Sequence, residues 1–137
     1  MYFFKSPLLN KAEGFLFYIT MKLLKITLTC TNLEKMTKFY SSVFNVNFSE
    51  HEFPGFKMYS GKIGDVNFLF CPNEIAGVEA KQNRHQFDYS TDNIDEVIEK
   101  GIYSGGRIHT DLQKTENESF VCLFDPDGNT INFIQKN

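Results

Sequence analysis

Several features that define particular protein classes are missing from this 137-residue sequence. It has no run of Lys and Arg, its net charge is −3, and its pI is near 5.6. Proteins that bind nucleic acids hold the phosphates with clustered basic residues, so we expect no nucleic-acid partner. The sequence also lacks a nucleophile elbow, a phosphate-binding glycine-rich loop and an HExxH motif. These absences remove the motif-based case for a serine hydrolase, a nucleotide-binding protein or a zinc peptidase.

Cysteine is scarce, and the spacing of the cysteines is not that of a metal site. The three cysteines, Cys30, Cys71 and Cys122, are far apart, odd in number and surrounded by apolar residues, and none belongs to a CxxC pair. This pattern predicts neither a disulfide framework nor a zinc site. We interpret the three residues as reduced core thiols of a cytoplasmic protein.

Long apolar runs that could cross a membrane are also missing. The apolar stretch 15–24 is interrupted by Lys22 and is too short to span a bilayer. It lacks the charged start and small-residue cleavage site of a secretory signal, so we expect no membrane association. A second methionine, Met21, suggests that residues 1–20 are a leader or an appended segment, and that 21–137 form a single domain.

Aromatic residues are abundant, with 15 Phe, and apolar residues recur in a pattern that repeats along the chain. A shift of 64 residues aligns Phe56 with Phe120 and Gly64 with Gly128. A shift of 61 residues aligns the segment that begins at Ile26 with the one that begins at Phe87. The two similar offsets indicate a duplicated unit of about 60 residues.

Each unit predicts a strand, a helix and three further strands, because alternating and helical apolar spacings follow one another in that order. In the helices, Asn32 and either Asp92 or Asn93 are the expected N-caps, and Gly101 is the expected stop. We therefore predict an α+β fold of two βαβββ modules, at 23–71 and 85–135, joined by a polar linker at 72–84. The predicted strands are 25–31, 46–51, 56–62, 65–71, 85–91, 107–113, 117–124 and 129–135.

Three segments resemble the vicinal oxygen chelate superfamily, which includes glyoxalase I, extradiol dioxygenases, and fosfomycin- and bleomycin-resistance proteins. They are LEKMTKFYSSVFNVNF (33–48), DNIDEVIEKG (92–101) and FDPDGNTINF (124–133), and the resemblance extends over about 23–135. It implies that the two modules curl into a mixed-sheet half-barrel with the helices outside. It also implies a small-molecule ligand on the concave face and a homodimer.

Metal-using members of this superfamily take ligands from the first and last strands of each module. The matching positions in this sequence hold Lys25, Phe68, Gln86 and Asn132. A protonated lysine repels a cation, phenylalanine offers no lone pair, and neutral amides are weak ligands without a carboxylate beside them. We therefore expect no metal ion and no other cofactor, and we expect Asn132 to stand where other members have a metal-binding Glu.

Strand alternation then predicts which side chains face the ligand. They are Lys25, Thr27, Thr29, Phe68, Phe70, Gln86, Asp88 and Asn132. Aromatic rings, hydroxyl groups, two amides and two opposite charges suit a small, partly aromatic organic molecule. The sequence thus predicts a metal-free binding protein of the glyoxalase/bleomycin-resistance type.

Other interpretations remain open at this stage. One is a divalent-metal-dependent lyase or dioxygenase whose displaced site draws on His51, His85, His109, Glu118 or Asp88. Another is that Lys25 pairs with Asp88 across the cavity, which would leave no ligand site. The same two residues are also a candidate acid and base for a metal-free enzyme.

Overall fold

The computed structural model describes residues 9–10, 15–16, 23–78 and 85–137. Most of the predicted leader, 1–20, lies outside the described residues, so the boundary at Met21 stays a prediction. Within that segment, β1 (Leu9–Asn10) pairs antiparallel with β2 (Phe15–Leu16). The predicted linker contains a short helix, α2 (Asn73–Ala76), and its residues 79–84 also lie outside the described ranges.

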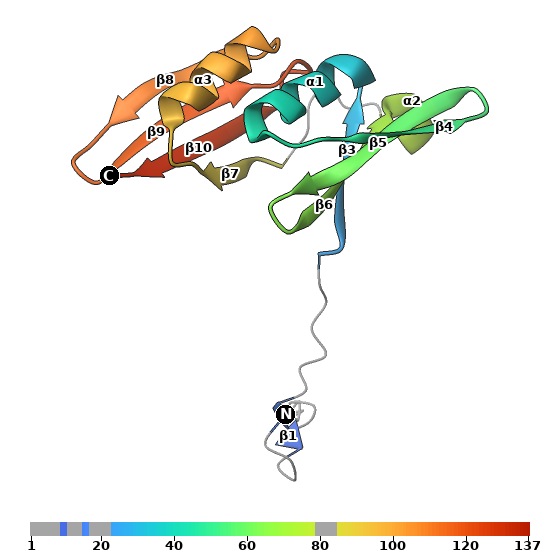
Figure 1. Ribbon diagram of the computed structural model, residues 1–137, viewed down its shortest axis with the longest axis horizontal. Helices are drawn as coiled ribbons and strands as arrows, with labels where there is room; N and C mark the ends of the chain where they lie inside the picture. Colours follow the sequence, from blue (N-terminus) through green and yellow to red (C-terminus); the bar gives the residue numbers. More distant parts are fainter. Residues whose placement is uncertain (1–8, 11–14, 17–22, 79–84) are drawn as a thin grey trace, which may run out of the picture.

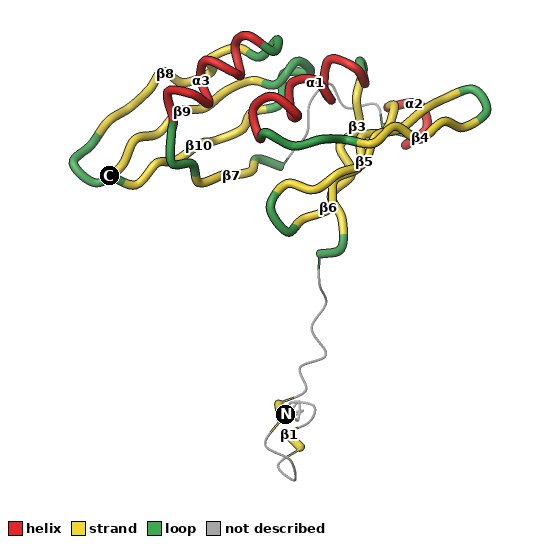
Figure 2. The backbone as a smooth tube through the Cα atoms, in the orientation of Figure 1, coloured by secondary structure: helices red, strands yellow, loops and turns green. Residues whose placement is uncertain are grey.

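The rest of the chain forms two modules with the same order of elements (Figures 1 and 2). Module one consists of β3 (Lys25–Cys30), α1 (Leu33–Phe44), β4 (Ser49–Phe53), β5 (Phe56–Ile63) and β6 (Val66–Pro72). Module two consists of β7 (Phe87–Ser90), α3 (Ile94–Tyr103), β8 (Arg107–Lys114), β9 (Glu118–Phe124) and β10 (Thr130–Lys136). The predicted α+β fold of two βαβββ modules is confirmed.

Each module has one four-stranded mixed sheet. The strand orders are β3-β6-β5-β4 and β7-β10-β9-β8. In each sheet the first strand lies parallel to the last one, and the other neighbours are antiparallel. The helix connects the first strand to the edge strand on the far side, so one face of each sheet carries a helix and the other is left uncovered (Figure 1).

Both long helices begin at an asparagine cap, as predicted for Asn32 and as one of two options for Asn93. The Lys35 amide donates to Asn32 Oδ1 over 2.9 Å, and the Glu96 amide donates to Asn93 Oδ1 over 3.1 Å. The prediction that Gly101 ends the second helix is wrong, because α3 continues to Tyr103. A β-carbon at Gly101 would lie 2.6 Å from Leu123 Cδ1, so glycine lets α3 approach the sheet there.

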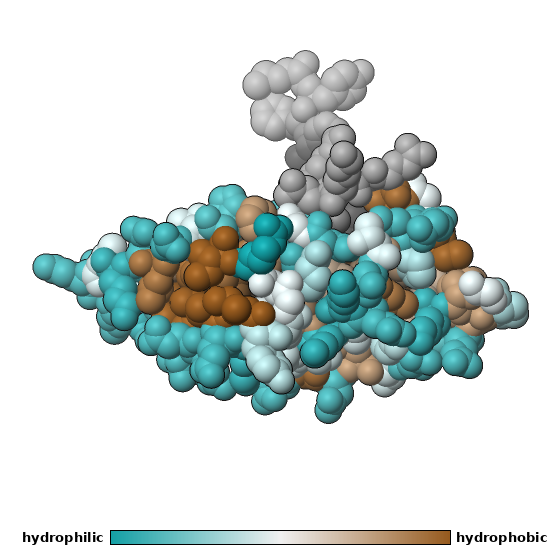
Figure 3. All heavy atoms as spheres, turned by 90° about the horizontal axis from the view of Figure 1, so that it is seen from above, coloured by the Kyte–Doolittle hydropathy of each residue, from teal (hydrophilic) through white to brown (hydrophobic). Residues whose placement is uncertain are grey.

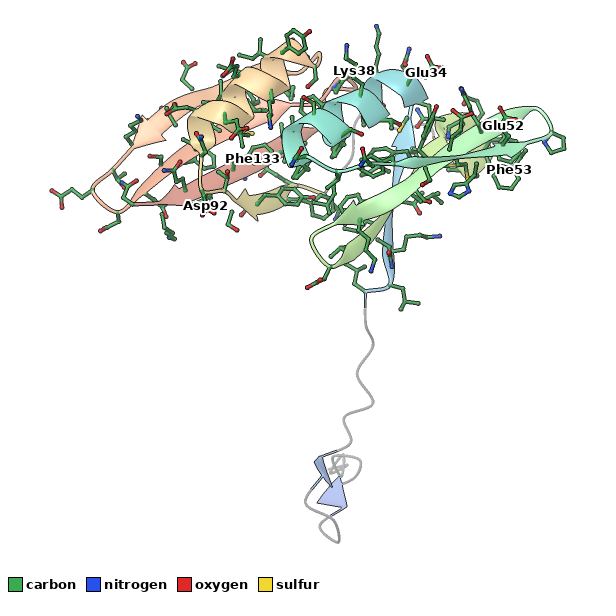
Figure 4. The ribbon with its side chains drawn as sticks, viewed as in Figure 1. Glu34, Lys38, Glu52, Phe53, Asp92 and Phe133 are labelled. Atoms are coloured by element: carbon green, nitrogen blue, oxygen red, sulfur yellow. The ribbon has the colours of Figure 1, made fainter. Side chains whose placement is uncertain are left out.

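One hydrophobic core extends through both modules on the helix side of the sheets. Helix α1 packs against α3, and the Phe44 ring at its end contacts module two. Its centroid lies 4.7 Å from that of Tyr89 and 5.7 Å from that of Phe133, which lies beneath the helices in Figure 4. The two sheets are therefore held together mainly by apolar and aromatic packing.

The turn that precedes β10, DPDGN, also ties the modules together. Asp125 is only 1% exposed, and its carboxylate accepts hydrogen bonds from the Asp127 amide, the Asn129 amide and side chain, and the Tyr40 hydroxyl of α1. Asp127 accepts bonds from the amide and the hydroxyl of Thr31, which follows β3. The turn thus positions the end of module one against the start of β10.

The outer surface is mainly polar on the face shown in Figure 3, with apolar side chains gathered over module two. Ile102 and Ile108 of this module are 50% and 39% exposed. None of the helices in the described part of the chain has the length and apolar character that a membrane crossing requires.

Candidate functional site

The uncovered face of module one is arranged in rows of side chains across the sheet. In the first row, the strand register places Lys25 of β3 beside Asn67 of β6, and Asn67 beside Lys62 of β5. The next row contains Thr27, Leu69, Ser60 and Ser49 in the same order across the four strands. Because side chains alternate between the faces of a strand, these rows point away from α1.

These rows form a hollow with a volume of about 700 Å³, which we call the module-one hollow. It is lined by Leu24, Lys25, Ser49, His51, Ser60, Gly61, Lys62, Asn67, Phe68 and Leu69. His51 Nε2 lies 2.6 Å from Ser60 Oγ, and Asn67 donates from Nδ2 to the Leu24 carbonyl over 3.2 Å. The hollow therefore combines cationic, hydroxyl and apolar groups on one sheet.

The uncovered face of module two carries most of the predicted polar residues. Asn132 Nδ2 donates to Asp88 Oδ1 over 2.7 Å, and Gln86 Nε2 donates to Thr130 Oγ1 over 2.8 Å. Cys122 lies beside Asn132 in the register, on the same face. The structure thus brings Gln86, Asp88 and Asn132 together on one face, in an arrangement where each amide already has a hydrogen-bond partner.

Phe68 and Phe70 were predicted to face the ligand, but the structure directs both side chains into the core, and only Phe68 also borders the module-one hollow. They are 2% and 0% exposed and belong to the core beneath α1, where Phe70 contacts the Tyr40 ring. Their neighbours Asn67 and Leu69 occupy the uncovered face.

The error in orientation comes from the repeat offset. Ile26 of β3 and Phe87 of β7 are equivalent positions in the two modules. Ile26 pairs with Phe68, and Phe87 pairs with Ile131. Phe68 is therefore equivalent to Ile131, at an offset of 63 residues rather than the 64 used for the prediction. The turn before the last strand differs in length between the modules. Four residues lie between the paired residues Lys62 and Asn67 in module one, whereas five lie between the equivalent pair Phe124 and Thr130 in module two. The longer turn in module two displaces the last strand relative to the strand before it. Leu69 is consequently the module-one counterpart of Asn132.

With that correction, the positions that the sequence resemblance assigns to metal ligands hold Lys25, Leu69, Gln86 and Asn132. These residues offer a cation, an alkyl side chain and two amides, which do not fit a divalent metal ion. The residues considered for a displaced site are also scattered. Among the described residues, no group of three or more His, Cys, Asp and Glu side chains is placed to hold a metal.

Lys25 and Asp88 do not form the pair that one interpretation required. Among the described ranges, ion pairs join Lys57 to Glu34 and Glu50, Lys100 to Glu96, and Lys136 to Glu118. Asp88 instead accepts its hydrogen bond from Asn132. Lys25 is exposed at the edge of the module-one hollow.

The three cysteines lie in the interior rather than in the module-one hollow. All three are free and buried, and burial raises the pKa of each thiol above its ordinary value. A thiol with a raised pKa is a poor nucleophile at neutral pH because little thiolate is present.

The sequence did not predict several residues of these faces as ligand-facing, although His51 and His109 were considered as ligands of a displaced metal site. Lys62, Ser60 and His51 lie on β5 and β4, and their alternate spacing would have placed them on one face if those strands had been included. On module two, the Arg107 guanidinium lies 4.9 Å from the Phe124 ring centroid, and the His109 ring lies 4.7 Å from the same centroid. The bulge in β8 that follows Ile108 brings His109 to this ring, and it has no sequence signal of its own.

Comparison with solved structures supports the fold. A hypothetical protein from S. aureus superimposes with a TM-score of 0.69 at 16% identity, covering 85% of this chain and 95% of the other. A glyoxalase-related enzyme from Fulvimarina pelagi gives 0.68 at 16% identity, with 85% and 88% covered. The fosfomycin resistance protein FosX from Mesorhizobium loti gives 0.62 at 15% identity, with 88% and 95% covered. At these identities the similarity establishes the fold alone.

Comparison with curated protein sequences found no match. A family model, described as the glyoxalase/bleomycin resistance protein/dioxygenase superfamily, matches residues 22–133. This range includes all of module one and module two as far as Phe133 in β10. The chain therefore belongs to the glyoxalase/bleomycin resistance protein/dioxygenase superfamily.

Proposed function

We propose that the protein binds a small, partly aromatic organic molecule on its uncovered sheet faces, without a metal ion. The observation that carries this proposal is the residue set Lys25, Leu69, Gln86 and Asn132 at the positions where metal-using relatives hold their ion. Two of the four are amides that are already hydrogen-bonded to neighbours. Such residues suit recognition of a neutral or anionic organic group better than cation binding.

The size and lining of the faces support a small-molecule ligand. The module-one hollow, at about 700 Å³, lies within the usual range for small-molecule sites. Leu69 gives it an apolar floor, and Ser49, Ser60 and His51 give it hydrogen-bonding groups. On module two, the Phe124 ring with Arg107 and His109 offers a surface for an aromatic group.

The names of solved relatives are compatible with this role. FosX from Mesorhizobium loti is a fosfomycin resistance protein, and a protein from Albidiferax ferrireducens is a glyoxalase/bleomycin resistance protein. Nothing among the described residues favours the metal-dependent lyase or dioxygenase, since their donor groups are not gathered.

The first test uses anilinonaphthalene sulfonate, whose fluorescence rises when its aromatic rings enter an apolar site. We expect saturable binding in the presence of EDTA. Replacing Leu69 with Trp fills the floor of the hollow and should weaken binding by about tenfold or more, equivalent to about 1.4 kcal/mol. The measurement is a fluorescence titration of each variant, after circular dichroism has shown that it is folded.

Ile102→Ser is the matched control, because Ile102 is an exposed apolar residue of α3 rather than of the uncovered faces. We expect this variant to bind the probe as the wild type does. Binding that requires an added divalent ion, or that Leu69→Trp leaves unchanged while Ile102→Ser removes it, would contradict the proposal.

We also propose a cytoplasmic homodimer. The free, buried cysteines support a reducing compartment. Edge strand β4 is exposed along its whole length, with Phe53 at the tip of its hairpin (Figure 4), and this edge is available to a second copy. Analytical ultracentrifugation tests the assembly directly, and a monomer at high concentration would contradict it.

A further inference from the structure

We propose that the module-one hollow recognises an anionic group of the ligand, of the carboxylate, sulfonate or phosphate class. This inference rests on the proposed function and specifies the class of molecule that the site takes. Its basis is the row formed by Lys25, Asn67 and Lys62 on the uncovered face.

The spacing of this row suits one anionic group between two lysines. Lys25 and Lys62 are both register partners of Asn67, so they lie two strand spacings apart, or about 10 Å between backbones. Lysine side chains are long enough to bring both ammonium groups to a single anion above Asn67. Lys25 and Lys62 are both exposed, so no packing holds their ammonium groups elsewhere.

The two lysines differ from the lysine on the opposite face of the same sheet. Lys57 contacts Glu34 at 3.4 Å and Glu50 at 3.3 Å, so its charge is compensated. Within the described residues, no ion pair includes Lys25 or Lys62. The lysine on the helix side of the sheet is therefore paired with carboxylates, whereas Lys25 and Lys62 in the hollow form no ion pair with any described residue.

The remaining lining reinforces the positive character of the hollow. Among the described residues that line it, none is acidic, although the whole chain carries a net charge of −3. Ser49, Ser60 and His51 stand one to two rows from the lysines and can donate hydrogen bonds to further oxygen atoms. A concave surface of one sign of charge attracts ligands of the opposite sign.

The test compares two probes that share their aromatic rings and differ in charge. Anilinonaphthalene sulfonate is anionic, and N-phenylnaphthylamine is its neutral counterpart. We expect the wild type to bind the anionic probe about tenfold more tightly, since two exposed ion pairs together contribute about that ratio. Raising the salt concentration should reduce the preference, because exposed charges are screened.

The double variant Lys25→Met, Lys62→Met is expected to lose the preference and bind the two probes with equal affinity. Lys114→Met, which removes an exposed charge from β8 of module two, should keep the preference. Equal affinity of the wild type for both probes, or a preference that survives the double substitution, would overturn the inference while leaving the proposed function intact. Binding of neither probe would remove the proposed function as well.

Discussion

Replacing Asp125 with Ala is expected to lower the free energy of unfolding by about 3–5 kcal/mol. The carboxylate is 1% exposed and accepts four hydrogen bonds, so its loss removes the shared acceptor of the buried Tyr40 hydroxyl and of the turn that contains Asn129. The turn would also lose the geometry that presents Asp127 to Thr31. Urea denaturation followed by circular dichroism measures the change.

Tyr40→Phe is the matched control for this prediction. It removes only one of the four bonds to Asp125, and we expect a loss of about 1–2 kcal/mol. The Tyr40 hydrogen bond lowers the pKa of Asp125, so this substitution should raise that pKa further. If Asp125→Ala cost no more than Tyr40→Phe, the buried carboxylate would not be the centre of the turn.

The pH dependence of stability gives a second check on Asp125. Burial raises its pKa above the ordinary value of 3.8, so the folded protein takes up this proton more readily than the unfolded chain does. The linked stabilisation is therefore full below the unfolded pKa and is lost as the pH rises through the folded pKa. Asp125→Ala should remove this component from the stability profile.

Replacing Gly106 with Ala is expected to cost about 2–4 kcal/mol, because the added methyl group has no space. A β-carbon there would lie 2.7 Å from the Phe124 carbonyl oxygen and 2.9 Å from that of Gly101, and it would also meet the Phe39 ring. Two of these three contacts are backbone atoms, which cannot move without shifting α3 relative to β9. Thermal unfolding by calorimetry measures the effect.

Gly101→Ala offers a comparison at a neighbouring close contact. Its β-carbon would meet Leu123 Cδ1 at 2.6 Å, which is a side-chain atom that can partly move away. We therefore expect a smaller loss than for Gly106→Ala. The opposite order would show that the core around Leu123 is more rigid than the backbone contacts of Gly106 with α3 and β9.

The fold was predictable because local and periodic signals agreed. Asn32 precedes a helical apolar pattern and caps α1, and the 61-residue offset correctly matches β3 with β7. Element boundaries were less accurate, since β4 starts at Ser49 rather than at residue 46. Asn45 ends α1 in a left-handed conformation with φ of 52°, and the chain needs further residues to reach the edge of the sheet.

The residues of the site were harder to predict than the fold, because the orientation of a strand depends on the length of the turn before it. Adding or removing a single residue in a turn reverses which side chains of the next strand face the core. Phe68 and Phe70 were consequently assigned to the wrong face, whereas Lys25, Thr27 and Thr29, which precede any turn of the module, kept their predicted alternation. Gly101 was predicted to end a helix, but it instead allows α3 to pack closely against Leu123. A contact between residues so far apart in the sequence leaves no local sequence pattern.

Metal content is the measurement that tests the central claim most directly. Purified protein would be incubated with zinc, nickel, manganese and iron(II), desalted, and analysed by elemental mass spectrometry. The residue set Lys25, Leu69, Gln86 and Asn132 predicts no stoichiometric retention of any of these ions. Retention of about one ion per chain, as a closed protein metal site would give, would contradict the account and favour a metal-dependent lyase or dioxygenase.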